Sequence, residues 1–104
     1  MSDFNSNMES AKRYLQPFQD NITGHYINGA MVVPEGSKTY NNSTPTDNTS
    51  LGRVVEGSAA DVSAACEAAE AAFPEWRDMP GAERKKLLHH FADKIVERAE
   101  EIAL

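Results

Sequence analysis

The apolar residues of this chain change their spacing about halfway along it. Residues 24–33 hold β-forming side chains on both sides of Asn28 and Gly29, a pair that favours the positive φ angles of a tight hairpin turn. Further short extended segments are predicted at 38–42 and 51–55, with a turn-rich loop at 43–50 between them. The sequence therefore predicts a short antiparallel β-meander over residues 22–57.

A helical spacing begins after residue 57. Ser58 is a good N-cap, and Asp61 three residues later is typical of a capping box. An apolar stripe at helical spacing follows, formed by Val62, Ala65, Cys66, Ala69 and Phe73. Pro74 is predicted to end this first helix, because an interior proline removes a backbone donor, and Trp76 is expected to pack in the corner behind it.

A second helix is predicted from Pro80 onward. Its apolar stripe consists of Leu88, Phe91, Ile95, Ala99 and Ile102, and its other face is charged. No Gly, Asn or cluster of bases marks a C-terminus, and the pattern is still in register at Leu104. We therefore expect the chain to be a truncated piece of a longer protein, with residues 58–104 forming part of a larger domain.

The N-terminal segment, residues 1–21, is polar and shows no sustained period. It is predicted to be a mobile leader, or a short unstable helix around residues 10–15 that ends before Pro17.

Composition narrows the function classes. The 104 residues include 10 Lys and Arg against 16 Asp and Glu, a formal net charge of −6, which disfavours a nucleic-acid partner. A single cysteine rules out an internal disulfide and fits a reducing compartment. There is no apolar run long enough to span a bilayer and no signal-peptide core, so we expect no membrane partner and a cytoplasmic location.

Three joints of this pattern resemble the N-terminus of the NAD(P)-dependent aldehyde dehydrogenase superfamily. They are the turn Tyr26-Ile27-Asn28-Gly29, the loop 43–48 with the strand 51–57 behind it, and the helix pair containing Ala72-Phe73, Trp76 and Glu83-Arg84. The resemblance covers about residues 22–104. The loop departs from the family pattern at Thr44 and at Asp47-Asn48, although Asn48 tolerates the positive φ of a turn glycine.

This resemblance implies an α/β fold in which the meander and the two helices flank a cofactor domain that is mostly missing here. In the family, a cysteine thiolate attacks an aldehyde, a hydride passes to NAD(P)+, and a glutamate-activated water hydrolyses the thioester. The matching cysteine, glutamate and dinucleotide turn would lie beyond Leu104, so no catalytic or cofactor-binding residue is assigned. The longer protein is expected to be a homodimer or homotetramer, and the helices resemble those of hydroxymuconic-semialdehyde and betaine-aldehyde dehydrogenases.

Several reactive side chains have plainer structural explanations. Cys66 lies on the apolar stripe, where burial disfavours the thiolate, so it is interpreted as a small core residue. His89 and His90 point about 100° apart on a helix and cannot share a metal ion as an i, i+4 pair can, and His25 has no second ligand nearby in the sequence. The basic triplet Arg84-Lys85-Lys86 is interpreted as a solvated helix face.

The resemblance implies one candidate binding site within this chain, for a monovalent cation. Some family members bind a monovalent cation partly through backbone carbonyls of the loop that matches Asn42-Ser43, so the carbonyl of Ser43 is a candidate ligand. A hypothesis of another class also stays open, namely a stand-alone acidic α+β module that presents its last apolar helix face to a partner.

Overall fold

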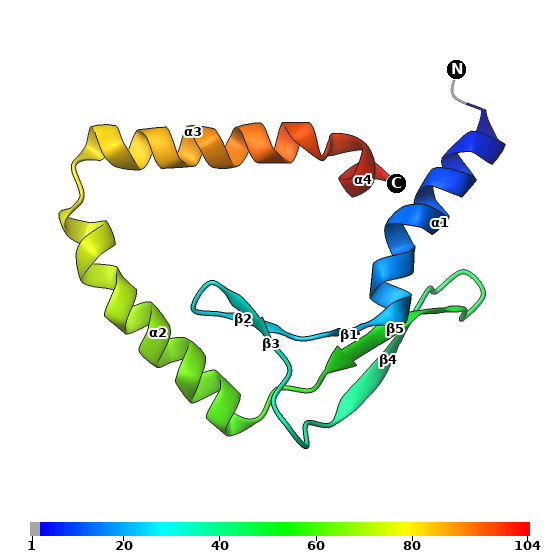
Figure 1. The fold of residues 1–104 in the computed structure, drawn as a ribbon, viewed down its shortest axis with the longest axis horizontal. Helices are drawn as coiled ribbons and strands as arrows, with labels where there is room; N and C mark the ends of the chain where they lie inside the picture. Colours follow the sequence, from blue (N-terminus) through cyan, green and yellow to red (C-terminus); the bar gives the residue numbers. More distant parts are fainter. Residues whose placement is uncertain (1–2) are drawn as a thin grey trace.

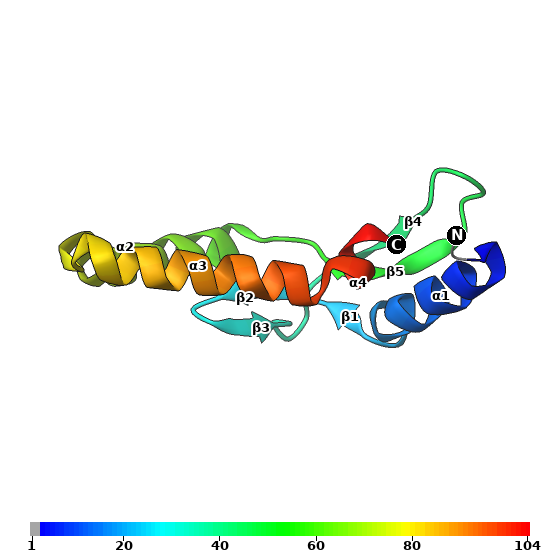
Figure 2. The ribbon, with the colours of Figure 1, turned by 90° about the horizontal axis from the view of Figure 1, so that it is seen from above.

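The computed structural model describes residues 3–104 as an open, flat ring of helices and short strands (Figure 1). The elements in chain order are α1 (Phe4–Asp20), β1 (Ile22–Thr23), β2 (His25–Ile27), β3 (Ala30–Val32), β4 (Thr39–Ser43), β5 (Ser50–Val55), α2 (Ala59–Asp78), α3 (Gly81–Glu97) and α4 (Ala99–Ala103). Seen from above the ring is thin (Figure 2), and its dimensions are 49 × 40 × 19 Å. The chain is thus a mixed helix and strand segment, as expected of an α/β protein.

The strands form two separate sheets, so the predicted single antiparallel meander is wrong. β4 pairs with β5 in antiparallel fashion, and β1 pairs with the other edge of β5 in parallel. β2 and β3 form a hairpin of their own, because the turn at Pro34–Ser37, closed by a 3.2 Å backbone hydrogen bond, leads the chain away from β3. The hairpin itself is confirmed, with φ angles of 52° at Asn28 and 77° at Gly29.

The start of α2 is confirmed and its predicted end is wrong. The Ser58 side chain accepts from the Asp61 backbone N–H (3.1 Å), and the Asp61 carboxylate accepts from the Ser58 N–H (2.8 Å), which completes the capping box. The helix runs on through Pro74 to Asp78. Pro74 is exposed, so the carbonyl that loses its helical donor there can be hydrated, and Trp76 therefore lies within the helix rather than in a linker.

The N-terminal segment is a helix of 17 residues, much longer than the short piece predicted, and Pro17 lies inside it. The Asp3 carboxylate caps its first turn by accepting from the Asn5 N–H at 3.3 Å. Its last turn packs against β5, where Gly52 has a φ of 130° and the Phe18 carbonyl oxygen would lie 2.2 Å from any Cβ at that position. The close approach to Gly52 fixes where α1 meets the sheet.

The second predicted helix is interrupted near its end. α3 begins at Gly81 with Pro80 at the N-cap, and it stops at Arg98, whose φ of −109° and ψ of 19° are not helical. The Arg98 guanidinium forms two hydrogen bonds with Glu101, of 2.8 and 2.6 Å, across the break. The short helix α4 then turns toward α1, and Tyr14 donates to Glu100 at 3.2 Å. The C-terminal helix α4 therefore meets the middle of α1 at one side of the ring (Figure 1).

The ring buries very little of its own apolar surface. Val55, at 3% exposure, is the only buried hydrophobic residue among residues 3–104. The accessible surface is 8451 Å², whereas a folded monomer of 11.4 kDa exposes about 5,800 Å². The radius of gyration is 17.9 Å, compared with about 13 Å for a compact domain of this length. No helix in the described part of the chain is long and apolar enough to cross a membrane.

Candidate functional site

The reactive side chains singled out in the sequence lie apart from one another. Cys66 is exposed on α2, so its interpretation as a core residue is wrong for the chain as described. His89 and His90 are exposed on α3, and His25 lies in β2 beside Asp61. Nowhere in residues 3–104 do three His, Cys, Asp or Glu side chains gather into a group that could hold a metal ion. The residues that the structure describes therefore bring no candidate nucleophile and base together.

Ser43, the candidate cation ligand, is the last residue of β4 and lies next to an irregularity in the sheet. The β4–β5 register shifts between Asn42 and Ser43, so that Ser43 pairs with Ser50. Both Asn42 and Ser43 are exposed. Carbonyl oxygens at such an exposed strand end are hard donors of the kind that suit a potassium or sodium ion, which makes the position chemically compatible with the site implied by the resemblance.

The loop after Ser43 is held by its own hydrogen bonds. The Thr44 N–H donates to the Thr49 carbonyl, and the Asn48 N–H donates to the Thr44 carbonyl, both at 2.9 Å. Asn48 has a φ of 61°, as expected for a residue in the place of a turn glycine. The Asp47 carboxylate accepts from the Thr49 N–H at 2.9 Å, and hydrogen bonding with Thr49 lowers the pKa of Asp47 below its usual value. This loop has a defined shape although it departs from the family pattern.

Arg84 has a structural role that the sequence did not reveal. Its Nη1 donates to the carbonyl oxygens of Trp76 (3.3 Å), Arg77 (3.2 Å) and Met79 (2.6 Å) at the C-terminus of α2. These carbonyls have no donor further along the helix, so a guanidinium there satisfies them and complements the helix dipole. The interpretation of the basic triplet as a solvated face is therefore wrong for Arg84. The only indication of this role in the sequence is that an arginine side chain is long enough to reach back to the preceding helix.

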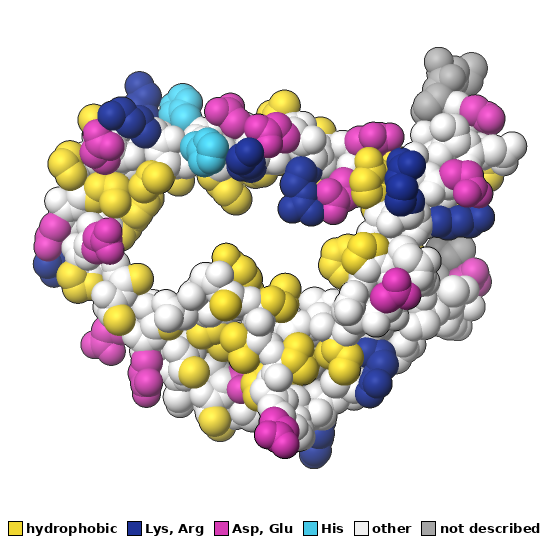
Figure 3. Space-filling model, in the orientation of Figure 1, with side chains coloured by type: hydrophobic (Ala, Val, Ile, Leu, Met, Phe, Trp, Pro, Cys, Tyr) yellow, Lys and Arg dark blue, Asp and Glu magenta, His cyan; other side chains and the backbone are white. Residues whose placement is uncertain are grey.

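The most extensive feature is the apolar surface that faces the opening of the ring. Figure 3 shows hydrophobic side chains gathered along the inner edges of α2, α3 and the strands, with charged side chains mainly along the outside. On α3 the stripe residues Leu88, Phe91 and Ile95 are 57, 64 and 46% exposed. On α2, Val62 and Phe73 are more than half exposed. Such a surface is typical of elements that pack against a further layer of protein.

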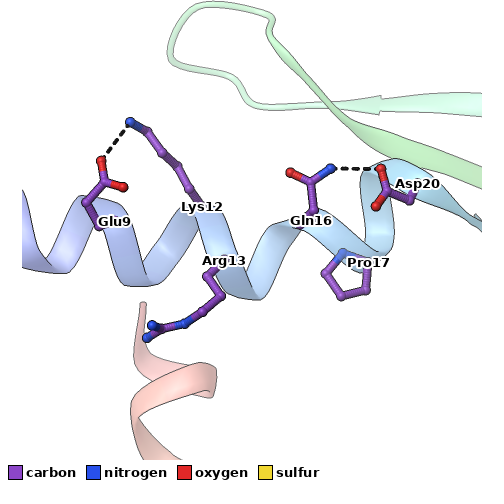
Figure 4. A pocket seen from close by; sticks show the side chains of 6 residues that line it. All are labelled: Glu9, Lys12, Arg13, Gln16, Pro17 and Asp20. Carbon is purple, nitrogen blue, oxygen red and sulfur yellow. Dashed lines mark hydrogen bonds and ion pairs between the residues drawn. The ribbon is translucent and has the colours of Figure 1, made fainter.

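An apolar cavity of about 610 Å³ lies where the two ends of the ring meet. Met8, Tyr14, Leu15 and Phe18 of α1 line one side, and Ile102 and Leu104 line the other. A second hollow lies against α1 (Figure 4), where Lys12 pairs with Glu9 at 3.2 Å and Gln16 donates to Asp20 at 2.7 Å. The polar groups of this second hollow largely satisfy one another, so it offers no reactive centre.

The glycines of the chain do not form a dinucleotide-binding turn. Gly29 and Gly36 occupy turns with positive φ, Gly52 receives α1, and a Cβ at Gly24 would lie 2.3 Å from the Val32 carbonyl oxygen. Each of these four glycines is explained by local backbone geometry. Gly57 lies between β5, which pairs in parallel with β1, and α2, but it stands without the further glycines of a dinucleotide-binding turn. The described residues thus do not fit an NAD(P) site, and no chemical step is assigned to them.

Comparisons with known proteins identify a family for this chain, which the geometry alone does not. The model of the aldehyde dehydrogenase family matches residues 32–104. Cytosolic 10-formyltetrahydrofolate dehydrogenase of Xenopus tropicalis is 38% identical over 80 residues, which cover 75% of this chain and 9% of that protein. N-succinylglutamate 5-semialdehyde dehydrogenase of Serratia proteamaculans (strain 568) is 37% identical over 78 residues, covering 75% of this chain and 16% of that protein.

A third relative, 2-hydroxymuconic semialdehyde dehydrogenase of Pseudomonas sp. (strain CF600), is 38% identical over 78 residues, covering 74% of this chain and 16% of that protein. No solved structure gives a significant match. This chain spans between 9 and 17% of the length of such curated relatives. The family match extends from β3 to the end of α4 and includes the helix pair and the loop after Ser43. The chain belongs to the aldehyde dehydrogenase family and corresponds to the N-terminal region of its longer members.

Proposed function

We propose that this chain is a structural segment of an enzyme that oxidises an aldehyde to a carboxylate with NAD(P)+. The observation that carries the proposal is the family match over residues 32–104. The bound nicotinamide cofactor would accept a hydride, and a cysteine thioester would be the covalent intermediate in the longer protein. Because residues 3–104 bring together no nucleophile, base or dinucleotide turn, the role of this segment is to pack, and it is inactive alone.

The amount of exposed surface supports this role over that of a stand-alone interaction module. The ring exposes about 2,700 Å² more than a compact monomer of its mass. A typical protein interface buries about 800 Å² on each partner. The excess is several times larger, which fits elements that are covered by the rest of a large domain. A module with one docking face would have buried most of the remainder internally.

The names of two relatives support a semialdehyde as the substrate class. Both N-succinylglutamate 5-semialdehyde dehydrogenase and 2-hydroxymuconic semialdehyde dehydrogenase are named for a substrate that carries an aldehyde and a carboxylate. The substrate-lining residues of the longer protein would lie outside this chain. For the whole protein we propose a homodimer or homotetramer in the cytoplasm, as the resemblance to the family implies.

A monovalent cation site at the Ser43 carbonyl is part of the same proposal. The support from the structure is that Asn42 and Ser43 are exposed and lie beside the register shift at the end of β4. The side-chain ligand would come from the longer protein. Replacing potassium by tetramethylammonium at constant ionic strength should lower the thermal stability of the full-length enzyme, and an unchanged unfolding temperature would exclude the site.

The assay for the main proposal is aldehyde-dependent formation of NAD(P)H by the full-length protein, across a panel of simple aldehydes and semialdehydes. Activity should be present in the full-length protein and absent from residues 1–104 alone. Cys66→Ser should retain activity, because Cys66 is an exposed helical residue with no assembled base. Loss of all turnover in Cys66→Ser, or no turnover with any aldehyde, would contradict the proposal. A soluble, cooperatively unfolding monomer of the 104 residues would favour the interaction module instead.

A further inference from the structure

The first residue of the β2–β3 hairpin faces the first turn of α2. The Nε2 atom of His25 lies 3.3 Å from Oδ2 of Asp61, and the two side chains are only 22 and 15% exposed. The Nε2 atom itself is buried, and no group in the described part of the chain forms a hydrogen bond with it. The Nε2 atom of His25 is thus held at ion-pair distance from the Asp61 carboxylate, without hydrogen-bond geometry.

The carboxylate is kept in place as an anion by its role in the helix cap. Oδ2 of Asp61 accepts from the Ser58 backbone N–H at 2.8 Å, at the positive end of α2. Hydrogen bonding with Ser58, first through its backbone and then through its side chain, lowers the pKa of Asp61, and the nearby His25 side chain adds smaller effects in the same direction, through its charge and its proximity. Asp61 therefore stays charged across the neutral and mildly acidic range, and the variable partner is the imidazole.

The pair lies at one end of the contact between the hairpin and α2. From there the hairpin runs along the alanine-rich side of the helix, and two shallow grooves of about 320 and 360 Å³ remain between them. The grooves are lined by Tyr26, Ile27, Asn28 and Gly29 on one side and by Val62, Ala65, Ala68, Ala69 and Ala72 on the other. Alanine offers little apolar area, so a polar contact at the end of this interface has a large relative weight.

We propose that protonation of His25 fastens the β2–β3 hairpin to the N-terminus of α2, so that this contact is a pH-sensitive latch. A protonated imidazole carries N–H groups on both nitrogens, and Nε2 then donates a charge-assisted hydrogen bond to the Asp61 carboxylate. A neutral imidazole with its proton on Nε2 offers only a weaker, uncharged donor, and one with its proton on Nδ1 sets a lone pair against that carboxylate. The hairpin is therefore held more tightly when His25 is protonated than when it is neutral, and histidine is the side chain whose charge responds to pH near neutrality.

The other charged side chains near His25 and Asp61 do not change the direction in which protonation of His25 affects their contact. Lys38 and Glu56 line the hollow on the far side of Asp61. They have opposite signs, and their backbones are joined by a 2.8 Å hydrogen bond from the Glu56 N–H to the Lys38 carbonyl. β3 places the uncharged Val32 opposite His25. Among the residues that the structure describes around this junction, Asp61 is therefore the charge that decides the effect of protonating His25.

The test is hydrogen exchange of the peptide that covers residues 24–33 in the full-length protein, corrected for the intrinsic pH dependence of exchange. In the wild type, the protection factor should fall about fivefold between about pH 5.5 and about pH 8, the size expected for a partly exposed charge-assisted hydrogen bond. His25→Gln should give the low protection at both pH values. His25→Lys, which keeps a positive charge throughout, should give the high protection at both.

His89→Gln is the matched control, because it removes a histidine from the exposed surface of α3 and should leave the wild-type pH response unchanged. A wild-type peptide with equal protection at both pH values would overturn the proposal. So would a pH response that persists in His25→Gln, or a His25→Lys variant that behaves like His25→Gln. None of these outcomes depends on whether the protein oxidises an aldehyde.

Discussion

Replacing Gly52 by alanine should detach α1 from the sheet. Gly52 has a φ of 130°, a region that residues with a side chain rarely adopt, and an added Cβ would lie 2.2 Å from the Phe18 carbonyl oxygen. Backbone strain of this kind costs about 1–3 kcal/mol. The contact is more than an ångström shorter than an ordinary carbon–oxygen contact of about 3.4 Å, so the last turn of α1 must also move. We expect a total loss of about 3 kcal/mol, or roughly a hundredfold in the opening equilibrium of α1.

Gly36→Ala separates the two contributions to that loss. Gly36 also has a positive φ, of 75°, but a Cβ there would meet no atom within 4 Å. This control should therefore cost about 1 kcal/mol from backbone strain and leave α1 in place. The assay is hydrogen exchange of the peptide over residues 4–20 in the full-length protein, together with thermal unfolding. Equal protection of that peptide in the two variants would refute the close packing of Phe18 on Gly52.

Three further predictions concern the ends of α2. Ser58→Ala should destabilise the first turn of α2 by about 1 kcal/mol, and Ser58→Asp should restore most of the loss, as measured by hydrogen exchange of that turn. Because the folded protein holds the pKa of Asp61 below its usual value near 3.8, the stability contributed by this group is complete above that value and is lost as the pH falls through the lowered pKa. Asp61→Asn should therefore flatten the acid limb of an unfolding curve between neutral pH and the strongly acidic range. Arg84→Met should lower the stability of the protein by about 1 kcal/mol, because three carbonyls at the C-terminus of α2 lose their donor. Lys85→Met on the same helix should leave the unfolding temperature nearly unchanged, and equal losses of stability in the two variants would contradict the capping role.

Features that depend only on a few neighbouring residues were predicted correctly from the sequence. The turn at Asn28-Gly29 needs only two residues that tolerate positive φ, and the capping box needs only Ser58 and Asp61 at the right spacing. Asn48 takes a left-handed conformation for the same local reason. In each case the energy that decides the geometry comes from groups within three or four residues of one another.

Features that depend on partners far along the chain were missed. Parallel pairing of β1 with β5 joins Ile22 to Arg53, and a two-residue strand has no periodicity by which to recognise it. Pro17 and Pro74 were expected to stop helices, yet both lie on exposed helical surface where water can replace the lost backbone donor. The burial expected for Cys66 requires atoms that the described residues do not supply.

The alanine-rich face of α2 explains why local sequence signals predict the caps and turns of this chain correctly, whereas the sequence does not predict which side chains are buried. Capping and turn geometry are satisfied within each element, so the helices and strands form with proper ends even though Val55 is the only buried hydrophobic residue among those described. Alanine stripes and exposed Leu88, Phe91 and Ile95 contribute to stability only when another layer approaches closely. An opening lined by such groups is too large to be covered by an interface of ordinary size, since about 800 Å² is buried on each partner. The physical requirement is thus for a continuous domain core across the ring, which is what membership of a family of much longer chains leads one to expect.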